Sequence, residues 1–409
     1  MPVPWPPRAA RHVAPLTALL FLALQGADGT LAVAWGLLAL GALASALCGM
    51  LDLQRPPSPI ERGLLYVLLA CAVSVVFGVD PRHSLALSVP TLASALLWIL
   101  IARARDATRM FVCTGLGLAA AAAIQIGLLL YTASREPGMT PARWVADAGA
   151  AWLVVPNDVA WIACALPLFA SLSTRRASAV LCVLLVAYLA LSILVQSRTG
   201  ALAAVGVALP VVAAWVGQRR QRPRGHWLIA VAVVAACGML TLLTLASMRA
   251  RIQLWSAAWA MFLDHPWTGA GLHDFVIGYR DYLPATAELV DPRLTPWPHQ
   301  LFLEIAAECG VIGILAASYL VAAVLRRALA CVSVGPPQRA LVAGLCGMLL
   351  LALVEATLLR QWVWLLGTTL CGLLSLEDPA ADQEEQQHEQ RIALDETASR
   401  QHLRHARRR

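Results

Sequence analysis

Lysine is absent from this chain of 409 residues, and charged residues of all kinds make up only 13% of it. Aromatic residues are also few, at 7%. Soluble globular domains carry about a quarter charged residues, so this composition excludes an ordinary water-soluble enzyme. The scarcity of charge and the apolar excess also exclude intrinsic disorder, because disordered chains are polar and highly charged.

Metal-binding and disulfide motifs are missing too. The ten cysteines are scattered singly, nearly all inside apolar runs, and no CxxC pair or Cys/His cluster occurs. His265 and His273, with the neighbouring Asp264 and Asp274, match no spacing of metal ligands, and their Pro and Gly neighbours favour a turn. The sequence therefore predicts no metal site, no cofactor and no disulfide framework.

Apolar residues make up 59% of the chain, and the mean hydropathy is +0.68. Twelve membrane spans would need about 240 apolar-dominated positions, which is close to what this fraction supplies. The pattern predicts an all-α polytopic membrane protein with about 12 transmembrane helices. The expected spans are 13–24, 30–51, 63–79, 84–101, 110–131, 151–172, 177–197, 199–217, 227–247, 301–325, 339–358 and 361–376.

The net charge of +7 comes from arginines in short clusters between the apolar runs. If the N-terminus is cytoplasmic, 22 of the 31 arginines fall on the cytoplasmic side, as the positive-inside rule requires. Dispersed clusters of this kind indicate membrane topology and not nucleic-acid binding. We expect both termini to be cytoplasmic.

Two segments depart from the pattern of short loops. Residues 248–300 form a long outside loop, in which 249–263 has helical spacing with an apolar face and is expected to lie along the membrane interface. Residues 377–409 form a polar tail, interpreted as a solvated cytoplasmic extension. The chain thus divides into a membrane domain, 1–376, and this tail.

The outside loops contain the polar groups that could carry chemistry. Arg198 lies in the short hairpin QSRTG, Arg249 and Arg251 open the long loop, and Asn157 and Asp158 come early in a span. Each arginine allows two interpretations. It is an interface anchor that reaches lipid phosphates, or a clamp for a diphosphate, because a guanidinium pairs bidentately and stays charged. The anchor interpretation is stronger for Arg249 and Arg251 taken alone.

His299 follows Trp297 at the start of an expected span. A lone histidine there commonly caps a helix or lies on the surface, but a neutral imidazole beside the outer arginines could also deprotonate a hydroxyl. Gln300, Glu304 and Glu308 follow on the same helix. Carboxylates are favoured near a helix N-terminus, and Glu308 lies deep in a span, so both are weaker candidates, for orienting His299 or an acceptor sugar. Gln300 and Arg249 are weaker candidates for the site as well.

Together these stretches resemble the O-antigen ligase family, within the superfamily of O-antigen ligases and polymerases. The resemblance rests on Arg198 followed after three residues by Leu202, and on His299 followed after ten residues by Gly310. The strings DHPWTGAGLHDF and EIAAECGVIGIL are similar to the family's long periplasmic loop and the helix after it. The resemblance covers roughly residues 150–325, and Gln300 stands where many relatives carry Asn, with the amide kept.

The resemblance implies a glycosyl transfer at the periplasmic face of the bacterial inner membrane. The donor would be a polysaccharide on undecaprenyl diphosphate, and the acceptor a sugar hydroxyl of lipid A–core oligosaccharide. By matching the motifs, His299 takes the role of general base, and Arg198 and Arg251 take the diphosphate. Arginines could stabilise the departing diphosphate without a metal.

Three other functions stay open. An O-antigen polymerase uses the same donor with a second lipid-linked chain as acceptor, and a protein O-oligosaccharyltransferase modifies Ser or Thr but tends to carry more soluble mass. A secondary transporter would also fit twelve helices, although transporters place charged sites near the bilayer midplane and often consist of two related halves. Here the polar residues gather toward one face.

Overall fold

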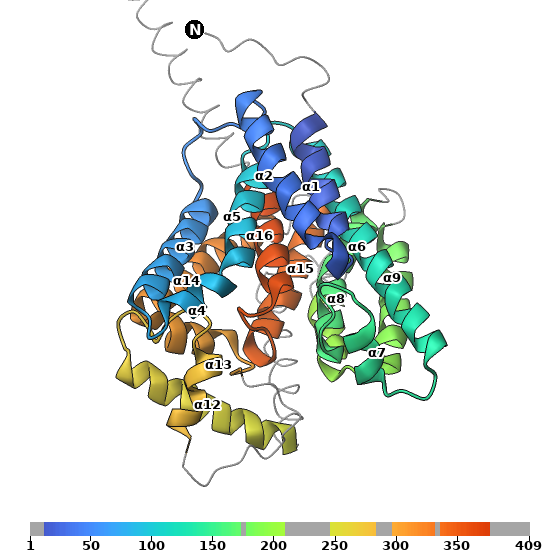
Figure 1. Cartoon of the computed structure of the whole chain (residues 1–409). Coiled ribbons are helices and arrows are strands. Elements are labelled where there is room, and N and C mark those ends of the chain that lie inside the picture. Colours follow the sequence, from blue (N-terminus) through green and yellow to red (C-terminus); the bar gives the residue numbers. More distant parts are fainter. Residues whose placement is uncertain (1–11, 173–176, 209–245, 284–296, 332–335, 377–409) are drawn as a thin grey trace, which may run out of the picture.

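The computed structural model describes residues 12–172, 177–208, 246–283, 297–331 and 336–376. Among these residues the chain forms helices joined by short connections, and no strand is present (Figure 1). The predicted all-α class is therefore confirmed for the part of the chain that the structure describes.

The helices follow the apolar runs of the sequence. The first half contains α1 (Val13–Leu24), α2 (Leu31–Leu47), α3 (Pro59–Phe77), α4 (Pro81–Leu87), α5 (Val89–Ala102), α6 (Ala107–Arg135) and α7 (Pro141–Asp147). The second half contains α8 (Ala160–Ser171), α9 (Ala177–Leu194), the helix Arg198–Ala208, α12 (Ala246–Asp264), α13 (Phe275–Gly278), α14 (Leu301–Cys331), α15 (Pro336–Val354) and α16 (Gln361–Leu376). The expected span 227–247 lies almost wholly outside the described residues.

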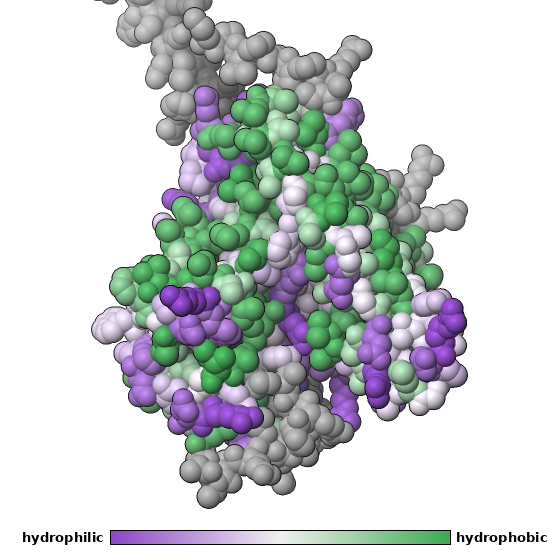
Figure 2. All heavy atoms as spheres, in the orientation of Figure 1, coloured by the Kyte–Doolittle hydropathy of each residue, from purple (hydrophilic) through white to green (hydrophobic). Residues whose placement is uncertain are grey.

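Several of these helices are suited to a membrane. Within the described residues, four helices are long and apolar enough to cross a bilayer, or five if α4 and α5, bent by 47°, form one span. Large apolar side chains point away from the protein, among them Leu47 (79% exposed) and Ile193 (77% exposed). Figure 2 shows hydrophobic residues over most of the upper surface and hydrophilic ones mainly toward the lower end. The chain is therefore a membrane protein, while the count of twelve helices stays a prediction.

Small residues let the helices approach closely, as is usual inside membranes. A Cβ on Gly63 of α3 would lie 2.8 Å from Leu320 Cα of α14, and a Cβ on Gly117 of α6 would lie 2.7 Å from the Leu19 carbonyl oxygen of α1. These contacts join α3 to α14 and α1 to α6, two of the most extensive helix pairs in the described fold. Any larger residue at either glycine would push the backbones apart.

Helix α14 is interrupted at Gly310, which has a left-handed backbone (φ 63°). The loop after α12 passes against the break: Val311 N donates to Pro266 O at 2.8 Å, and Ala270 N donates to Ala307 O at 2.8 Å. A Cβ on Gly310 would lie 2.5 Å from the Trp267 backbone. Glycine is therefore required here, both for the backbone conformation and for the close approach of the loop.

The connections around α7, α12 and α13 lie toward the lower end of the molecule in Figure 1 and are joined by polar contacts. The Trp255 indole of α12 bonds Pro298 O at 2.6 Å, and the Asp158 carboxylate accepts the Trp362 indole N–H at 3.0 Å. Asp274 accepts Asp80 N at 3.0 Å. Segments far apart in the sequence are thus fixed to one another at the end where the candidate residues lie.

Candidate functional site

The connection between α15 and α16, residues 355–360, is held in place by a carboxylate of α14. Glu304 is fully buried, and its Oε1 accepts Thr357 Oγ1 at 2.6 Å and Leu358 N at 3.0 Å. A buried polar group that lost such a partner would be strongly destabilising, so these bonds fix the conformation of the connection. Glu304, a weaker candidate in the sequence, thus positions this loop.

His299 lies directly before α14 and has a left-handed backbone (φ 52°). This conformation is uncommon for a residue other than glycine, and where it persists the surroundings impose it. Trp255 on α12 fixes the preceding carbonyl, and Gln300 Oε1 accepts Leu303 N, which caps the first turn of α14. The histidine is 2% exposed. Gln300 therefore acts as a helix cap beside the candidate base.

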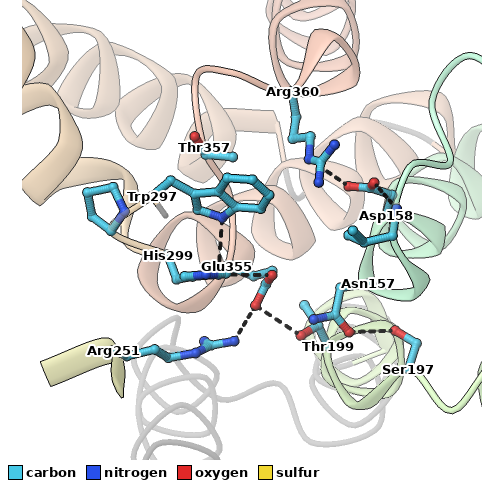
Figure 3. A network of polar contacts seen from close by, with 12 residues as sticks. Asn157, Asp158, Ser197, Thr199, Arg251, Trp297, His299, Glu355, Thr357 and Arg360 are labelled. Carbon is cyan, nitrogen blue, oxygen red and sulfur yellow. Dashed lines mark hydrogen bonds and ion pairs between the residues drawn. The ribbon is translucent and has the colours of Figure 1, made fainter. Parts of the chain in front are cut away.

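Glu355 lies at the centre of a polar network (Figure 3). Arg251 Nη2 is 2.5 Å from Glu355 Oε2, Thr199 Oγ1 is 3.5 Å from the same oxygen, and His299 Nδ1 is 3.1 Å from Oε1. Burial would raise the pKa of Glu355, but the positive charges of a protonated His299 and of Arg251, with hydrogen bonds from His299 and Asn157, lower it to about 2. The carboxyl group is therefore ionised at neutral pH.

Two side chains compete for the same nitrogen of His299. Trp297 Nε1 and Glu355 Oε1 both lie 3.1 Å from His299 Nδ1. The two contacts require opposite protonation states of Nδ1, because an indole N–H can only donate a hydrogen bond and a carboxylate can only accept one. The charge-assisted bond to the ionised carboxylate is the stronger one, so it favours a proton on Nδ1. The lone pair is then on Nε2, the nitrogen that would accept a proton from a substrate.

Arg360 extends the network on the other side of Trp297. Its guanidinium carbon lies 4.6 Å from the centre of the indole ring, and its Nε is 3.4 Å from Asp158 Oδ1. Asp158 Oδ2 in turn accepts the backbone N–H groups of Val154 at 3.0 Å and Val155 at 2.9 Å. Figure 3 shows Arg360 and Arg251 on opposite sides of the Trp297–His299–Glu355 group. One guanidinium group therefore lies against Trp297 and another against Glu355, the two side chains that contact the imidazole.

The structure brings together some of the predicted site residues. Arg251 is buried (8% exposed) and contacts the Glu355 carboxylate. Arg198 is exposed and begins the helix Arg198–Ala208. It lies between Thr199, which contacts Glu355, and Ser197, whose hydroxyl lies 3.2 Å from Asn157 Oδ1. Arg249 lies on α12, but its side chain is outside the described part of the structure.

Glu308 holds a different part of the chain. It is fully buried, and its carboxylate accepts His273 N at 2.9 Å and Phe275 N at 3.4 Å. These bonds fix the loop that crosses the break at Gly310. The expected helix over 249–263 is present as α12, while its position along the membrane interface stays a prediction. Glu308 thus supports the loop between α12 and α13.

Sequence reasoning missed Glu355, Trp297 and Arg360 as parts of the site. The hydropathy pattern places Glu355 near the end of the expected span 339–358, and Arg360 is one of the nine arginines that do not fall on the expected cytoplasmic side. A single carboxylate in an otherwise apolar run was the available signal, because ionisable groups in such runs are costly and functional. Among the described residues, no group of three or more His, Cys, Asp or Glu side chains is arranged to hold a metal ion.

Comparison with known protein families gives one match. Residues 180–318 match a family model described as O-antigen ligase. This range contains Arg198, Arg251 and His299, whereas Glu355 and Arg360 lie beyond it. No curated protein matches the chain significantly. The resemblance to the O-antigen ligase family, first seen in the Arg198 and His299 motifs, is therefore confirmed over residues 180–318.

Proposed function

We propose that the chain is a glycosyltransferase of the O-antigen ligase type. It transfers a polysaccharide from undecaprenyl diphosphate to a sugar hydroxyl of lipid A–core oligosaccharide, at the periplasmic face of the inner membrane. The observation that carries the proposal is the contact of His299 with the ionised Glu355 beside Arg251. The family match over the residues that contain His299 and Arg251 supports it.

The reaction needs a base for the acceptor hydroxyl and positively charged groups that stabilise the departing diphosphate. The acceptor oxygen attacks the anomeric carbon of the donor, His299 Nε2 takes the hydroxyl proton, and the bond from the anomeric carbon to the diphosphate oxygen breaks. The electron pair of that bond leaves with the diphosphate. Glu355 stabilises the imidazolium that forms, as a buried carboxylate does beside a catalytic histidine. The energy is already present in the glycosyl–diphosphate bond, so no ATP is required.

Arginine side chains receive the departing diphosphate in this proposal. A guanidinium has five N–H donors, so Arg251 can hold Glu355 and a phosphate oxygen together. Arg198 is exposed next to Thr199, which contacts Glu355. It is therefore available to a ligand that approaches from outside. Preorganised charge of this kind stabilises the leaving group as it develops, and the proposal requires no metal ion.

An O-antigen polymerase would use the same donor, and the product separates the two enzymes. We expect a strain that lacks this protein to make lipopolysaccharide with bare core and to accumulate polymer on undecaprenyl diphosphate. Core capped by a single repeat unit would instead identify a polymerase. Normal polymer-bearing lipopolysaccharide would exclude both functions and favour a transporter or another role. The network residues His299, Glu355 and Thr199 lie directly before α14, directly after α15 and at the start of the helix Arg198–Ala208. This placement at helix ends argues against a transport site near the bilayer midplane.

A further inference from the structure

A cavity of about 320 Å³ lies where the broken helix α4–α5 meets the connection between α15 and α16. Its apolar walls include Trp35 of α2, Leu87 of α4, Val89 of α5, and Leu358 and Leu359 of the connection. The volume is at the small end of the range for ligand sites. Leu87 and Val89 are still 39% and 38% exposed, so the cavity opens on a surface that bears apolar side chains.

His273 also lines this cavity, and its side chain is unusual. It is 1% exposed, and neither ring nitrogen has a hydrogen-bond partner among the described residues. Its backbone is left-handed (φ 66°) and is held by the bond from His273 N to Glu308. The indole N–H of Trp35 is likewise without a partner in the described structure. Buried polar groups without partners are rare and need an explanation.

The chemistry of the lining defines the ligand. Burial and, to a lesser degree, the charge of His83 lower the pKa of His273 to about 4, so the ring is neutral at pH 7. No charged side chain lines the cavity, so a phosphate group would be left there without a counter-charge. Trp35 can only donate a hydrogen bond, and the neutral imidazole can donate one and accept one. The matching ligand brings hydrocarbon together with an uncharged acceptor oxygen.

We propose that the cavity binds the first part of an ester- or amide-linked acyl chain of a membrane lipid, and that its carbonyl oxygen pairs with Trp35 and His273 after their buried ring nitrogens turn toward the cavity. Polyprenyl diphosphates do not fit this description, because the oxygens attached to their hydrocarbon belong to the charged diphosphate. The cavity shares the connection 355–360 with the candidate site, since Leu358 and Leu359 lie between Glu355 and Arg360. The binding of an acyl chain does not depend on the proposed function. Only the identification of this lipid as the acceptor substrate rests on it.

Photolabelling of the purified full-length protein in detergent tests the proposal. The probe is a phosphatidylethanolamine whose acyl chain carries a diazirine close to the ester, and labelled peptides are identified by mass spectrometry. We expect labelling at residues 86–90 and 358–359. Leu87→Trp, which fills the cavity, should abolish it. The matched control is Leu85→Trp, on the same helix but outside the cavity lining and 62% exposed, and it should label like the wild type.

Competition by unlabelled lipids then tests whether the protein recognises the carbonyl oxygen of the acyl chain. An ether-linked phosphatidylethanolamine lacks only the carbonyl oxygens and should compete about two- to tenfold more weakly than the ester, which corresponds to one neutral hydrogen bond. Trp35→Phe should remove this preference even if Leu87→Trp fails to fold. Equal competition by the ether lipid, stronger competition by undecaprenyl phosphate, or labelling that persists in a folded Leu87→Trp protein would each overturn the proposal.

A last arm distinguishes two sources of the acyl chain. Stronger competition by hexa-acylated lipid A than by the phospholipid would identify the acceptor as the occupant, and equal competition would identify a bilayer lipid. Both results support an acyl site. If the transfer reaction proves not to exist, the labelling pattern still decides whether the cavity binds an acyl chain, so the two proposals fail separately.

Discussion

Replacement of Glu355 by glutamine keeps the size of the side chain and removes its charge. The pKa of Glu355 is lowered from 4.5 to about 2 despite burial, chiefly by the charges of His299 and Arg251. A difference of about 2.5 pKa units corresponds to about 3 kcal/mol of stabilisation of the ionised form by its surroundings. The part of this stabilisation that comes from His299 exists only while the imidazole is protonated, which in the proposed reaction is the state formed when His299 takes the hydroxyl proton. We therefore expect Glu355→Gln to lower the rate of transfer by about 10²-fold.

The assay is single-turnover transfer by purified protein from a polyprenyl-diphosphate donor to lipid A–core. Because Glu355 acts through His299, the double variant Glu355→Gln/His299→Ala should be no slower than His299→Ala alone, since residues that act as a unit are not additive. Donor affinity should change little. A Glu355→Gln protein with a wild-type rate, or losses that multiply in the double variant, would refute the pairing of these two residues.

Glu61 offers a matched control for the loss of a buried carboxylate. It is 1% exposed, near the start of α3, and its carboxylate oxygens lie 2.7 Å from Arg103 Nε and 3.2 Å from Arg55 Nη2. Loss of one partner of a buried ion pair is destabilising. Glu61→Gln should therefore lower the thermal unfolding temperature but leave the rate per folded molecule unchanged. A rate loss as large as that of Glu355→Gln would mean that the assay reports folding and not chemistry.

Three further predictions concern charge, topology and pH. Arg251→Lys keeps the charge but loses the guanidinium fork, so transfer should fall by about ten- to hundredfold; full activity of the lysine variant would show that a generic cation suffices. Alkaline phosphatase fused after Leu283 should be active in cells and fused after Arg222 it should be silent, and the reverse pattern would contradict the proposed orientation. The pKa of His273 is about 4 in the fold and about 6.5 in the unfolded chain, so the unfolded state binds more protons between these values. The free energy of unfolding is therefore highest above pH 6.5, and it falls by about 3 kcal/mol as the pH drops toward 4. Thermal unfolding of His273→Asn should therefore depend less on pH in this window, and equal slopes for both proteins would refute the assignment.

Hydropathy located most of the described helices but not their interruptions. The ranges 13–24 and 361–376 coincide with α1 and α16. The expected span 84–101 is divided at Ser88 into α4 and α5, and α14 is broken at Gly310. The run 301–325 is apolar apart from Glu304 and Glu308, and its break arises from a loop some forty residues earlier that donates and accepts hydrogen bonds at the gap. A pattern local to the helix does not contain that information.

Only part of the candidate site could be predicted from the sequence. His299 and Arg251 could be identified because their side chains suit the chemistry and because both lie in the segment that the sequence predicts to be an outside loop. Glu355 contacts both of them only because the fold brings together α12, the residues before α14 and the residues after α15. Arg360 contacts Trp297 for the same reason. These pairings are properties of the tertiary structure, and neither spacing nor composition could have revealed them.

The role of His299 as the base is tested most directly by His299→Ala in the same purified system, with chelator present. Gln300→Asn is the matched control, because asparagine also caps helices well and should preserve the start of α14. General-base catalysis contributes about 10²–10⁴-fold. We therefore predict that His299→Ala loses transfer by that factor while it binds the polyprenyl-diphosphate donor like the wild type. Transfer by His299→Ala at the rate of Gln300→Asn would contradict the mechanism.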